Sequence, residues 1–369
     1  MYILFILNSL AIGGAENYSV SLMNEFVNIG HKVELMVLSN DLSLANRLSQ
    51  SVEMKVMPRR RRFDVSVLLQ IRGIIKRNRY DAVVSSYSWY SRLAALFLRD
   101  IPLTVYPLHS TIPMGMKSDL LRFIDFRLKR LNEIYLTSTD SQTDYLVSRY
   151  CLNRGFFSQI YNGVDTEKFT IPTAGFDRRL FMTKLRIPQD HRVILIVAGF
   201  RVEKKHTDAF EAFRILQTKV NDVTLLCVGN NNEGHRTLLQ SYIHQRGIKN
   251  IVLLTAKEAG DVREYYWIAD LFTLTSDKVE TFSISALEAM ASGVPCVLTD
   301  IGGARDYIHD GFNGFLSKAN DVKDISEKWQ MALYDHDFDK KMIRENIINR
   351  YSIKESTRRY IDLFNRRCP

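Results

Sequence analysis

Short apolar runs alternate with longer amphipathic stretches along the whole chain. In the first half, the apolar runs predict buried strands, and the stretches with apolar residues at helical spacing predict helices between them. The expected strands lie at residues 2–7, 33–38, 52–57, 82–85, 103–108, 133–138 and 157–161, and the expected helices at 15–28, 64–78, 88–98, 116–131 and 140–149. Continuous apolar strands that alternate with helices are typical of a parallel, doubly wound sheet.

The alternation stops in the middle of the chain and then begins again. Residues 166–190 lose their periodicity and contain Pro172, Gly175 and Pro188, which indicates a linker. Beyond it we expect strands at 193–198, 223–228, 251–254, 271–275 and 295–298, and helices at 206–219, 235–246, 261–268, 282–292, 321–334, 338–349 and 353–366. The sequence therefore predicts an α/β protein with two doubly wound, Rossmann-like domains, residues 1–165 and 191–350, and a C-terminal helix in 351–369 that packs back on the first domain.

The composition is that of a soluble globular protein. Hydrophobic residues make up 46% of the 369 positions and charged residues 25%, which excludes a disordered chain. No apolar run approaches the roughly 20 residues that a membrane-spanning helix needs. The N-terminal apolar run ends at once in Asn8 and Ser9, so it predicts a first strand rather than a signal peptide. The four cysteines have neither metal-ligand nor redox spacing, which favours reduced thiols in a cytosolic protein.

The positive charge is concentrated in one part of the first domain. Between Lys55 and Arg130 there are sixteen Lys and Arg residues against five Asp and Glu, whereas the net charge of the whole chain is +9. The remaining residues are therefore slightly acidic. A local basic patch suits an anionic partner, which is a membrane surface, a nucleic acid or a phosphorylated substrate.

Three candidate features follow predicted strands, where doubly wound sheets bind their ligands. Gly13 and Gly14 follow the first strand, and glycine there allows a close backbone approach to a phosphate. His109 follows the strand 103–108 and is placed to hydrogen-bond a substrate hydroxyl. A plain turn and a structural histidine are the competing interpretations of these two features.

The third feature is the pair Glu280 and Glu288. On a helix, a separation of eight residues is a little over two turns, so both carboxylates could lie near one face. The helix is expected to begin around Phe282 and Ser283, where its free N–H groups would attract an anion, and to end at a left-handed Gly293. Two solvated glutamates are the competing interpretation.

Two further charged segments are candidates for chemistry. Arg201 and Lys204 lie in the loop after the first strand of the second domain, where they can neutralise a diphosphate or belong to an ordinary charged loop. The segment from Asp335 to Asp339 has an acidic, metal-like pattern. It lies between two predicted helices and away from any strand end, so we predict no metal there.

In this order, these pieces resemble the retaining glycosyltransferases of the GT-B fold (glycosyltransferase family 4-like), which include bacterial lipopolysaccharide, capsule and mannosyl transferases. The resemblance covers essentially the whole chain, and the ordered set of motifs is more specific than any one of them. The motifs are Gly13-Gly14-Ala15-Glu16, Leu108-His109, Asn162-Gly163-Val164-Asp165, Phe200-Arg201-Val202-Glu203-Lys204, Glu280 to Glu288, and Thr299-Asp300-Ile301-Gly302-Gly303.

The resemblance implies roles for the residues of the second domain. Glu280 would contact the donor sugar's hydroxyls and help to stabilise an oxocarbenium-like transition state, and Glu288 would bind the ribose hydroxyls of the nucleotide. Backbone amides of three neighbouring residues would contact the sugar and the diphosphate: Phe282, Ser283 and Ile284.

It also implies how charge on the leaving diphosphate is neutralised. Lys204, with Arg201, would bind the diphosphate, and Gly14 would pass close to it from the other domain. His109 would contact the donor sugar near the reacting carbon. Arg201 departs from the family pattern, because the frequent arginine position is Gly199 here.

The predicted function is therefore that of a retaining, metal-independent hexosyltransferase. It would move a hexose or N-acetylhexosamine from a nucleotide diphosphate sugar, with UDP favoured over GDP, to a saccharide acceptor in bacterial surface polysaccharide biosynthesis. We expect a lipid-linked acceptor, bound by the first domain, and a cytoplasmic protein that docks on the inner face of the plasma membrane. The segment Leu120–Leu131 mixes apolar and basic residues and is the candidate for docking, although a core helix with a solvated basic face fits the same pattern.

Other functions fit the sequence less well. A GT-B sugar-nucleotide epimerase would act on the nucleotide sugar without an acceptor, and a phosphorylase would need a cofactor-lysine segment that the sequence lacks. A nucleic-acid-binding protein would use the basic patch but would leave the Glu280–Glu288 set without a purpose. We therefore expect no nucleic-acid partner.

Overall fold

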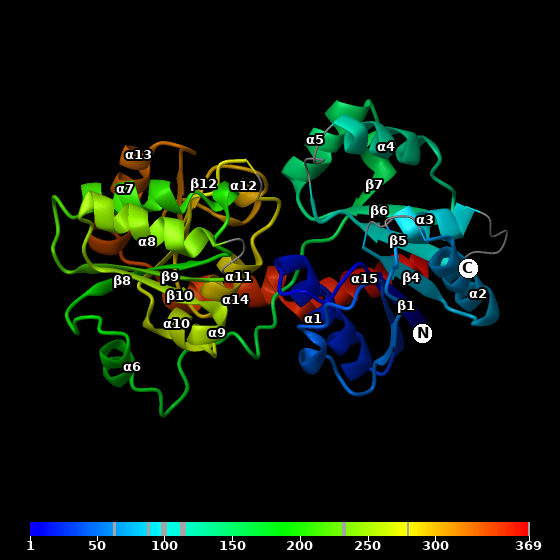
Figure 1. The fold of residues 1–369 in the computed structure, drawn as a ribbon, viewed down its shortest axis with the longest axis horizontal. Helices are drawn as coiled ribbons and strands as arrows, with labels where there is room; N and C mark the ends of the chain where they lie inside the picture. The colour runs from blue at the N-terminus through cyan, green and yellow to red at the C-terminus, as the bar shows by residue number, and fades with distance from the viewer. Residues whose placement is uncertain are drawn as a thin grey trace. The chain divides into compact units, whose positions relative to one another are not determined.

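The computed structural model describes residues 1–61, 64–86, 89–96, 102–110, 116–230, 234–278 and 280–367. The chain divides into two compact units (Figure 1), one formed by Met1–Gly163 with Ser352–Pro369 and the other by Val164–Tyr351. Each unit contains one sheet, and all strand pairs within it are parallel. The predicted fold class, α/β with two doubly wound domains, is confirmed.

The first unit has a seven-stranded sheet in the order β3-β2-β1-β4-β5-β6-β7. The strands are β1 (Tyr2–Leu7), β2 (Lys32–Val37), β3 (Glu53–Val56), β4 (Ala82–Ser85), β5 (Leu103–Pro107), β6 (Glu133–Thr137) and β7 (Phe157–Gln159). The helices are α1 (Gly14–Asn28), α2 (Val65–Arg77), α3 (Trp89–Leu96), α4 (Met116–Arg127), α5 (Asp140–Tyr150) and α15 (Ile353–Arg367). The strand order reverses beside β1, which makes its carboxyl end a natural ligand position.

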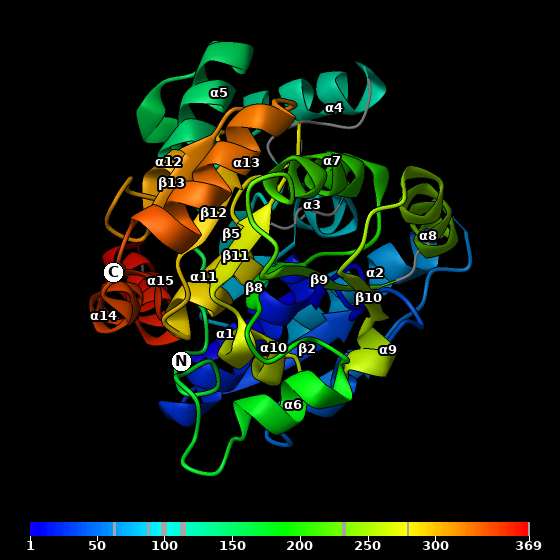
Figure 2. The ribbon, with the colours of Figure 1, turned by 90° about the vertical axis from the view of Figure 1, so that its left-hand side faces the viewer.

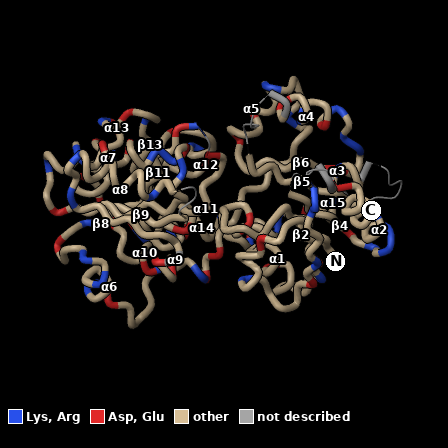
Figure 3. Tube along the Cα trace, in the orientation of Figure 1, with Lys and Arg blue, Asp and Glu red and all other residues tan. Residues whose placement is uncertain are grey.

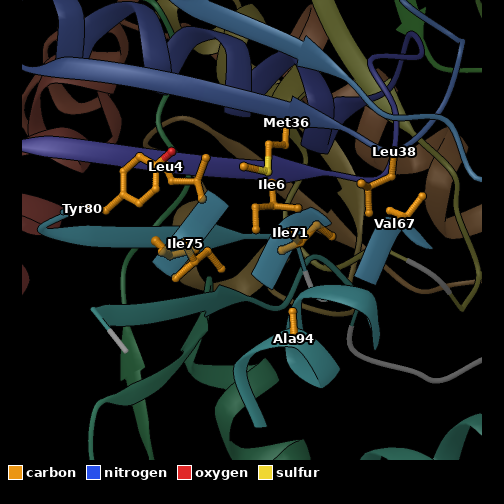
Figure 4. Packing of buried hydrophobic residues seen from close by; sticks show 10 residues of the cluster. Leu4, Ile6, Met36, Leu38, Val67, Ile71, Ile75, Tyr80 and Ala94 are labelled. Atoms are coloured by element: carbon orange, nitrogen blue, oxygen red, sulfur yellow. The ribbon is translucent and has the colours of Figure 1, made fainter. Parts of the chain in front are cut away.

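Apolar residues of the strands and helices pack directly against each other in this unit. Figure 4 shows Ile6 of β1 facing Ile71 of α2, with Met36 of β2 beside them, and all three side chains are fully buried. The C-terminal helix α15 packs on α1, where Phe26 stacks on Phe364 at a centroid distance of 6.1 Å. The last helix therefore belongs to the core of the first unit.

The second unit has a six-stranded sheet in the order β10-β9-β8-β11-β12-β13. The strands are β8 (Arg192–Val197), β9 (Val223–Gly229), β10 (Ile251–Thr255), β11 (Leu271–Leu274), β12 (Cys296–Thr299) and β13 (Gly314–Ser317). The helices are α6 (Arg178–Lys184), α7 (His206–Leu216), α8 (His235–Arg246), α9 (Ala256–Ala259), α10 (Arg263–Ile268), α11 (Ile284–Ala291), α12 (Ala304–Tyr307), α13 (Val322–Gln330) and α14 (Lys340–Tyr351). Figures 1 and 2 show α7 and α13 side by side over one face of the sheet and α10 over the other.

The elements of the second unit that were not expected from the sequence include β13 and α6, besides the four-residue helices α9 and α12. The edge strand β13 pairs with β12, but it has four residues and begins with Gly314, so it offers no apolar run to detect. Helix α6 lies within the expected linker 166–190, and Arg178 at its start forms an ion pair with Asp270 (Nη2 to Oδ2, 2.8 Å). Part of that segment is thus packed on the second unit.

Candidate active site

The start of α11 separates the two glutamates of the Glu280–Glu288 pair. Glu280 lies in the loop between β11 and α11, and the first residue of the helix is Ile284. Ser283 caps the helix, because its hydroxyl accepts a hydrogen bond from the backbone N–H of Ala286 at 3.2 Å. The helix start expected around Phe282 and Ser283 is therefore confirmed, with Glu280 before the helix and Glu288 in its second turn. The possibility that both carboxylates lie on one helical face does not hold.

The structure brings Lys204 and Glu280 together, although they are 76 residues apart. Lys204 ends a short 3₁₀ turn after β8, and its ammonium lies 2.5 Å from Oε2 of Glu280. Their side chains are only 12% and 17% exposed. Arg201 does not join them, because its half-exposed guanidinium pairs with Glu203 at 3.1 Å. The pair is thus partly desolvated but still open to solvent, so a ligand can reach it.

A second set of contacts fixes the loop after β8 to the loop after β11. Lys205 forms an ion pair with Asp277 (Nζ to Oδ2, 3.4 Å), and the Thr275 hydroxyl donates to the Lys205 carbonyl at 3.0 Å. Lys205 has φ +49°, a left-handed conformation that favours glycine, and it is the N-cap position of α7. Two parallel ion pairs therefore join these loops.

Gly302 supports Glu280 through the backbone. A Cβ atom on Gly302 would lie 1.6 Å from the carbonyl oxygen of Glu280, so no other residue fits there. The next amide, that of Gly303, donates a hydrogen bond to the carbonyl of Thr281 at 3.1 Å. The sequence contained this Gly-Gly pair as part of the family pattern, but its contact with Glu280 required the structure.

Glu288 is held by a buried tyrosine. The Tyr266 hydroxyl donates a hydrogen bond to Oε2 of Glu288 at 2.7 Å. Burial, and then the charge of Glu288, raise the pKa of Tyr266 well above its usual value, so this hydroxyl keeps its proton and remains a donor. Sequence reasoning missed Tyr266, because it lies on α10 and nothing in its local pattern points to Glu288.

The residues between the glutamates form the entrance of α11. Phe282 packs its ring on Tyr307 at a centroid distance of 4.9 Å and is buried. The backbone N–H of Ser283 donates to the Tyr307 hydroxyl at a long 3.4 Å, and Ile284 begins the helix. The first-turn N–H groups give this end of α11 a partial positive charge that favours an anion.

The first unit has its own pocket of about 240 Å³ near the ends of β1, β4 and β5. Its lining residues are Asn8, Ser9, Ala15, Glu16, Ser86, Pro107, Leu108, His109, Ser110 and Arg122. Burial lowers the pKa of His109 to about 4, because desolvation disfavours the imidazolium, so the ring is neutral at pH 7. Burial raises the pKa of the Glu16 carboxyl for the same reason. Gly14 begins α1 and is exposed, but it does not line this pocket.

The candidate residues thus fall into two groups. Gly14 and His109 belong to the first unit, and the other seven belong to the second. Within the described part of the chain, no group of three or more His, Cys, Asp or Glu side chains is placed to hold a metal ion. A search of the same residues for a helix long and apolar enough to cross a membrane also finds none.

Two α/β units, each built on one parallel sheet, are the architecture of the GT-B class. A glycosyltransferase fold of this kind is seen in Anabaena HepE in complex with UDP-glucose, which superimposes with a TM-score of 0.81 at 17% identity and covers 99% of this chain and 100% of HepE. Family models for glycosyl transferases group 1 and glycosyltransferase family 4 match residues 177–348 and 12–168. The chain belongs to glycosyltransferase family 4, as the sequence resemblance indicated.

Two curated relatives match parts of this chain in sequence. N-acetyl-alpha-D-glucosaminyl L-malate synthase of Bacillus anthracis is 29% identical over 210 residues, which are 56% of this chain and 52% of that protein. The match therefore spans about half the length of that relative. N,N'-diacetylbacillosaminyl-diphospho-undecaprenol alpha-1,3-N-acetylgalactosaminyltransferase of Campylobacter jejuni is 24% identical over 268 residues, or 69% of this chain and 67% of that protein.

Proposed function

We propose that this chain is a retaining glycosyltransferase that moves a hexose or N-acetylhexosamine from a nucleotide diphosphate sugar to a saccharide acceptor. The observation that carries the proposal is the Lys204–Glu280 pair beside the N-terminus of α11. Glycosyl transfer develops positive charge on the sugar and negative charge on the departing diphosphate. Lys204 can neutralise the negative charge of the diphosphate, and Glu280 beside it can stabilise the positive charge of the sugar.

Within the second unit, each group has a proposed task. Lys204 neutralises the diphosphate, and Glu280 contacts the donor sugar and stabilises its positive charge. Glu288, fixed by Tyr266, accepts hydrogen bonds from the ribose hydroxyls. The amides at the entrance of α11 supply further positive charge: Phe282, Ser283 and Ile284. Because Lys204 and the N-terminus of α11 together would neutralise the negative charge of the leaving diphosphate, we expect transfer without an added divalent metal.

The remaining candidates have supporting roles. Arg201 contributes to diphosphate binding by releasing Glu203, with which it pairs at 3.1 Å. Gly14 lets the backbone of α1 approach the diphosphate closely. His109, neutral because of its lowered pKa, hydrogen-bonds a hydroxyl of the donor sugar.

Two relatives support a choice of the donor nucleotide and of the kind of acceptor. A fold relative binds UDP-glucose, which favours UDP over GDP as the leaving group here. The Campylobacter relative is named for transfer to a diphospho-undecaprenol-linked sugar, which supports a lipid-linked acceptor in bacterial surface polysaccharide synthesis. The first unit, with its polar pocket around His109 and Glu16, would bind that acceptor.

With a lipid-linked acceptor, we propose that the enzyme works on the cytoplasmic side, at the inner face of the plasma membrane. The charge distribution supports this location. Lys and Arg gather on α2 in Figure 3, including Arg72, Lys76 and Arg77. The exposed arginines 59–61 precede this helix, whereas Arg62 lies outside the described residues.

A thermal-shift screen with UDP, GDP and their sugars tests the proposal, since a ligand of the native state raises the unfolding temperature. We expect UDP and a UDP-sugar to raise it in the wild type and to lose this effect in Lys204→Ala. If no nucleotide stabilises the chain, or if a nucleotide sugar is turned over fully without an acceptor, the proposal is wrong.

A further inference from the structure

Helix α4 and the turn after it expose apolar side chains and bury charged ones. Arg122 and Asp125 are buried, with exposed fractions of 7% and 2%. The opposite side exposes six large apolar residues, here called the apolar stripe, with exposed fractions from 41% for Phe123 to 97% for Leu131. The stripe consists of Leu120, Leu121, Phe123, Ile124, Leu128 and Leu131. A core helix with a solvated basic face, the alternative left open by the sequence, is therefore wrong for this segment.

The stripe runs along the exposed side of the segment. Within α4, Leu120 and Ile124 are four residues apart, the spacing that keeps side chains on one helical face, and Leu121 and Phe123 flank this line. Helix α4 ends at Arg127, but the N–H of Leu128 still donates to the carbonyl of Ile124 at 3.2 Å, so Leu128 continues the line. Leu131 lies in the turn that leads to β6 and extends the exposed apolar surface beyond the helix.

A buried charge network fixes this orientation. Nε of Arg92 on α3 lies 2.5 Å from Oδ1 of Asp125, and Arg92 also pairs with Glu133. The Tyr135 hydroxyl donates to the other Asp125 oxygen at 2.6 Å. Arg92 Nη2 also donates to the carbonyl of Leu128 at 2.6 Å. The polar face of α4 is therefore anchored inward by hydrogen-bonded charges.

Aromatic packing adds a second anchor on the same side. Phe126 is buried among other rings, with centroid distances of 4.9 Å to Tyr135, 5.2 Å to Tyr150 and 5.5 Å to Phe157. Rotating α4 to bury the stripe would expose Phe126 and leave Arg92 and Asp125 unpaired inside the unit. The exposure of the stripe is consequently a fixed property of the folded unit.

The charges around the stripe favour an anionic binding partner. Among the described side chains of residues 118–131, Arg127 is exposed and Lys129 and Arg130 are half-buried, whereas Arg122 is buried. The acids of this segment are Asp119 and Asp125. Both acids are satisfied internally, Asp125 by Arg92 and Asp119 by Arg149 and the Tyr150 hydroxyl. On the stripe itself, the guanidinium of Arg127 lies over the Phe123 ring at 5.0 Å. An apolar line with an excess of basic side chains is the pattern of a helix that lies in the interface of an anionic membrane.

We propose that the apolar stripe docks this chain on an anionic lipid surface. Segment 116–131 would lie parallel to the surface, with the stripe among the acyl chains and Arg127 at the headgroups. The segment is too short to span a bilayer, which needs roughly 20 residues, so it stays in the interface. The inference rests on the proposed function only for its purpose, which is to bring the transferase to a lipid-linked acceptor.

Vesicle flotation of the full chain at low salt tests this proposal. The wild type should float with phosphatidylcholine vesicles that contain phosphatidylglycerol and should not float with phosphatidylcholine alone. The double variant Leu120→Gln/Ile124→Gln should partition at least about tenfold more weakly, because each leucine-sized side chain contributes to burial in the acyl region. Its unfolding temperature should stay unchanged, since both side chains are exposed in the folded unit.

A matched control uses exposed leucines of the second unit. Leu180 and Leu238 are 54% and 65% exposed, so Leu180→Gln/Leu238→Gln changes the same chemistry elsewhere and should float as the wild type does. A third variant, Arg59→Gln/Arg60→Gln/Arg61→Gln, separates the stripe from the basic loop before α2. It should weaken flotation less than the stripe variant does.

Four results would overturn the docking surface. These are no flotation of the wild type, normal flotation of the stripe variant, equal loss in the control, and a wild-type dimer that the stripe variant breaks up without any vesicle binding. The last would assign the stripe to a second copy of the chain. Stabilisation by UDP, measured on each variant, keeps the two proposals apart. UDP binding without flotation contradicts only the docking surface, and flotation without nucleotide binding contradicts only the transferase.

Discussion

The chain contains two charge clusters of similar chemistry in different surroundings. In the first unit, Arg92, Asp125 and Glu133 have side chains at most 2% exposed, and Tyr135 fills a remaining acceptor position. In the second, Lys204 and Glu280 keep 12% and 17% exposure. The first cluster is closed by protein and can only hold α4 in place. The second keeps access to solvent, and we propose that it exchanges its partner for a ligand, so that residual exposure separates an anchor from a proposed binding site.

The largest expected effect is the loss of stability on breaking the closed cluster of Arg92, Asp125 and Glu133. Arg92→Ala leaves two carboxylates buried without their cation, so it should lower the free energy of unfolding by about 3–5 kcal/mol. Urea unfolding followed by circular dichroism measures this. Arg149→Ala is the control, because Arg149 is 53% exposed in its pair with Asp119 and its removal should change stability little. Equal losses in both variants would contradict the distinction.

Opening the second cluster should change catalysis rather than stability. Glu280→Gln removes the charge proposed to face the developing cation, so turnover should fall about 10²- to 10³-fold. The same change frees Lys204 from its ion pair, so the affinity for free UDP should stay the same or rise by up to about fivefold. Single-turnover kinetics and calorimetry measure the two effects. Weaker UDP binding in Glu280→Gln would show that the pair does not compete with the diphosphate.

A buried histidine of the second unit tests the comparison with a group that is closed off by protein but, within the described part of the chain, not paired. His206 is 2% exposed, and neither of its ring nitrogens has a hydrogen-bond partner among the described residues. Burial lowers its pKa from 6.5 to about 4. The unfolded chain therefore takes up the proton first, and stability falls as the pH drops below about 6.5.

At pH 5 the loss from this histidine should be about 2 kcal/mol relative to pH 7.5. The variant His206→Phe, which keeps the ring and its packing on Phe200, should flatten the pH dependence of unfolding over this range. An unchanged pH profile in the variant would show that other groups control acid stability. His109, with its pKa also lowered to about 4, contributes in the same direction and remains in both proteins.

A smaller effect is expected from removing the hydrogen bond between the Tyr266 hydroxyl and Glu288. Tyr266→Phe removes the hydrogen bond to Glu288 without changing the packing of the ring, so the affinity for UDP should fall about fivefold, equivalent to about 1 kcal/mol. Calorimetry with UDP checks this. Tyr265→Phe is a matched control, since that hydroxyl bonds to the carbonyl of Ala259 instead.

The smallest effect concerns the ion pair between Lys205 and Asp277, which joins the loops after β8 and β11. Lys205→Gly removes the pair with Asp277 but relieves a left-handed conformation, and these changes nearly cancel, within about 1 kcal/mol. Lys205→Ala loses the pair and keeps the strain, so it should be the less stable of the two. Thermal unfolding of both variants measures the difference. The reverse order would mean that the strain at this position is negligible.

Much of the fold follows from the sequence, because buried parallel strands have continuous apolar runs that need no tertiary information. The positions of Lys204, His109 and Glu280 after strands were predictable for the same reason. The start of α11 near Phe282 and Ser283 was also predicted, and the Ser283 cap agrees with it. The contacts that hold Glu280 outside the helix were not, because they come from Lys204 and Gly302, which lie in other loops.

Long-range polar contacts were equally invisible in the sequence. Arg92 lies 33 residues from Asp125 and 41 from Glu133, and only the folded sheet brings them together. The amphipathic pattern of 116–131 was evident, but the pattern does not say which face turns inward. That orientation is decided by Arg92 and by the aromatic contacts of Phe126.

The contact between Gly302 and the carbonyl of Glu280 has a consequence for how such an enzyme can diversify. Because the position of Glu280 is held by backbone atoms, a substitution of the neighbouring Thr281 should leave in place the carboxylate that we propose to contact the sugar. A library of variants at position 281, next to that carboxylate, can therefore test whether the preference for the donor sugar changes while turnover is kept. Any substitution of Gly302, in contrast, should abolish activity for every donor at once.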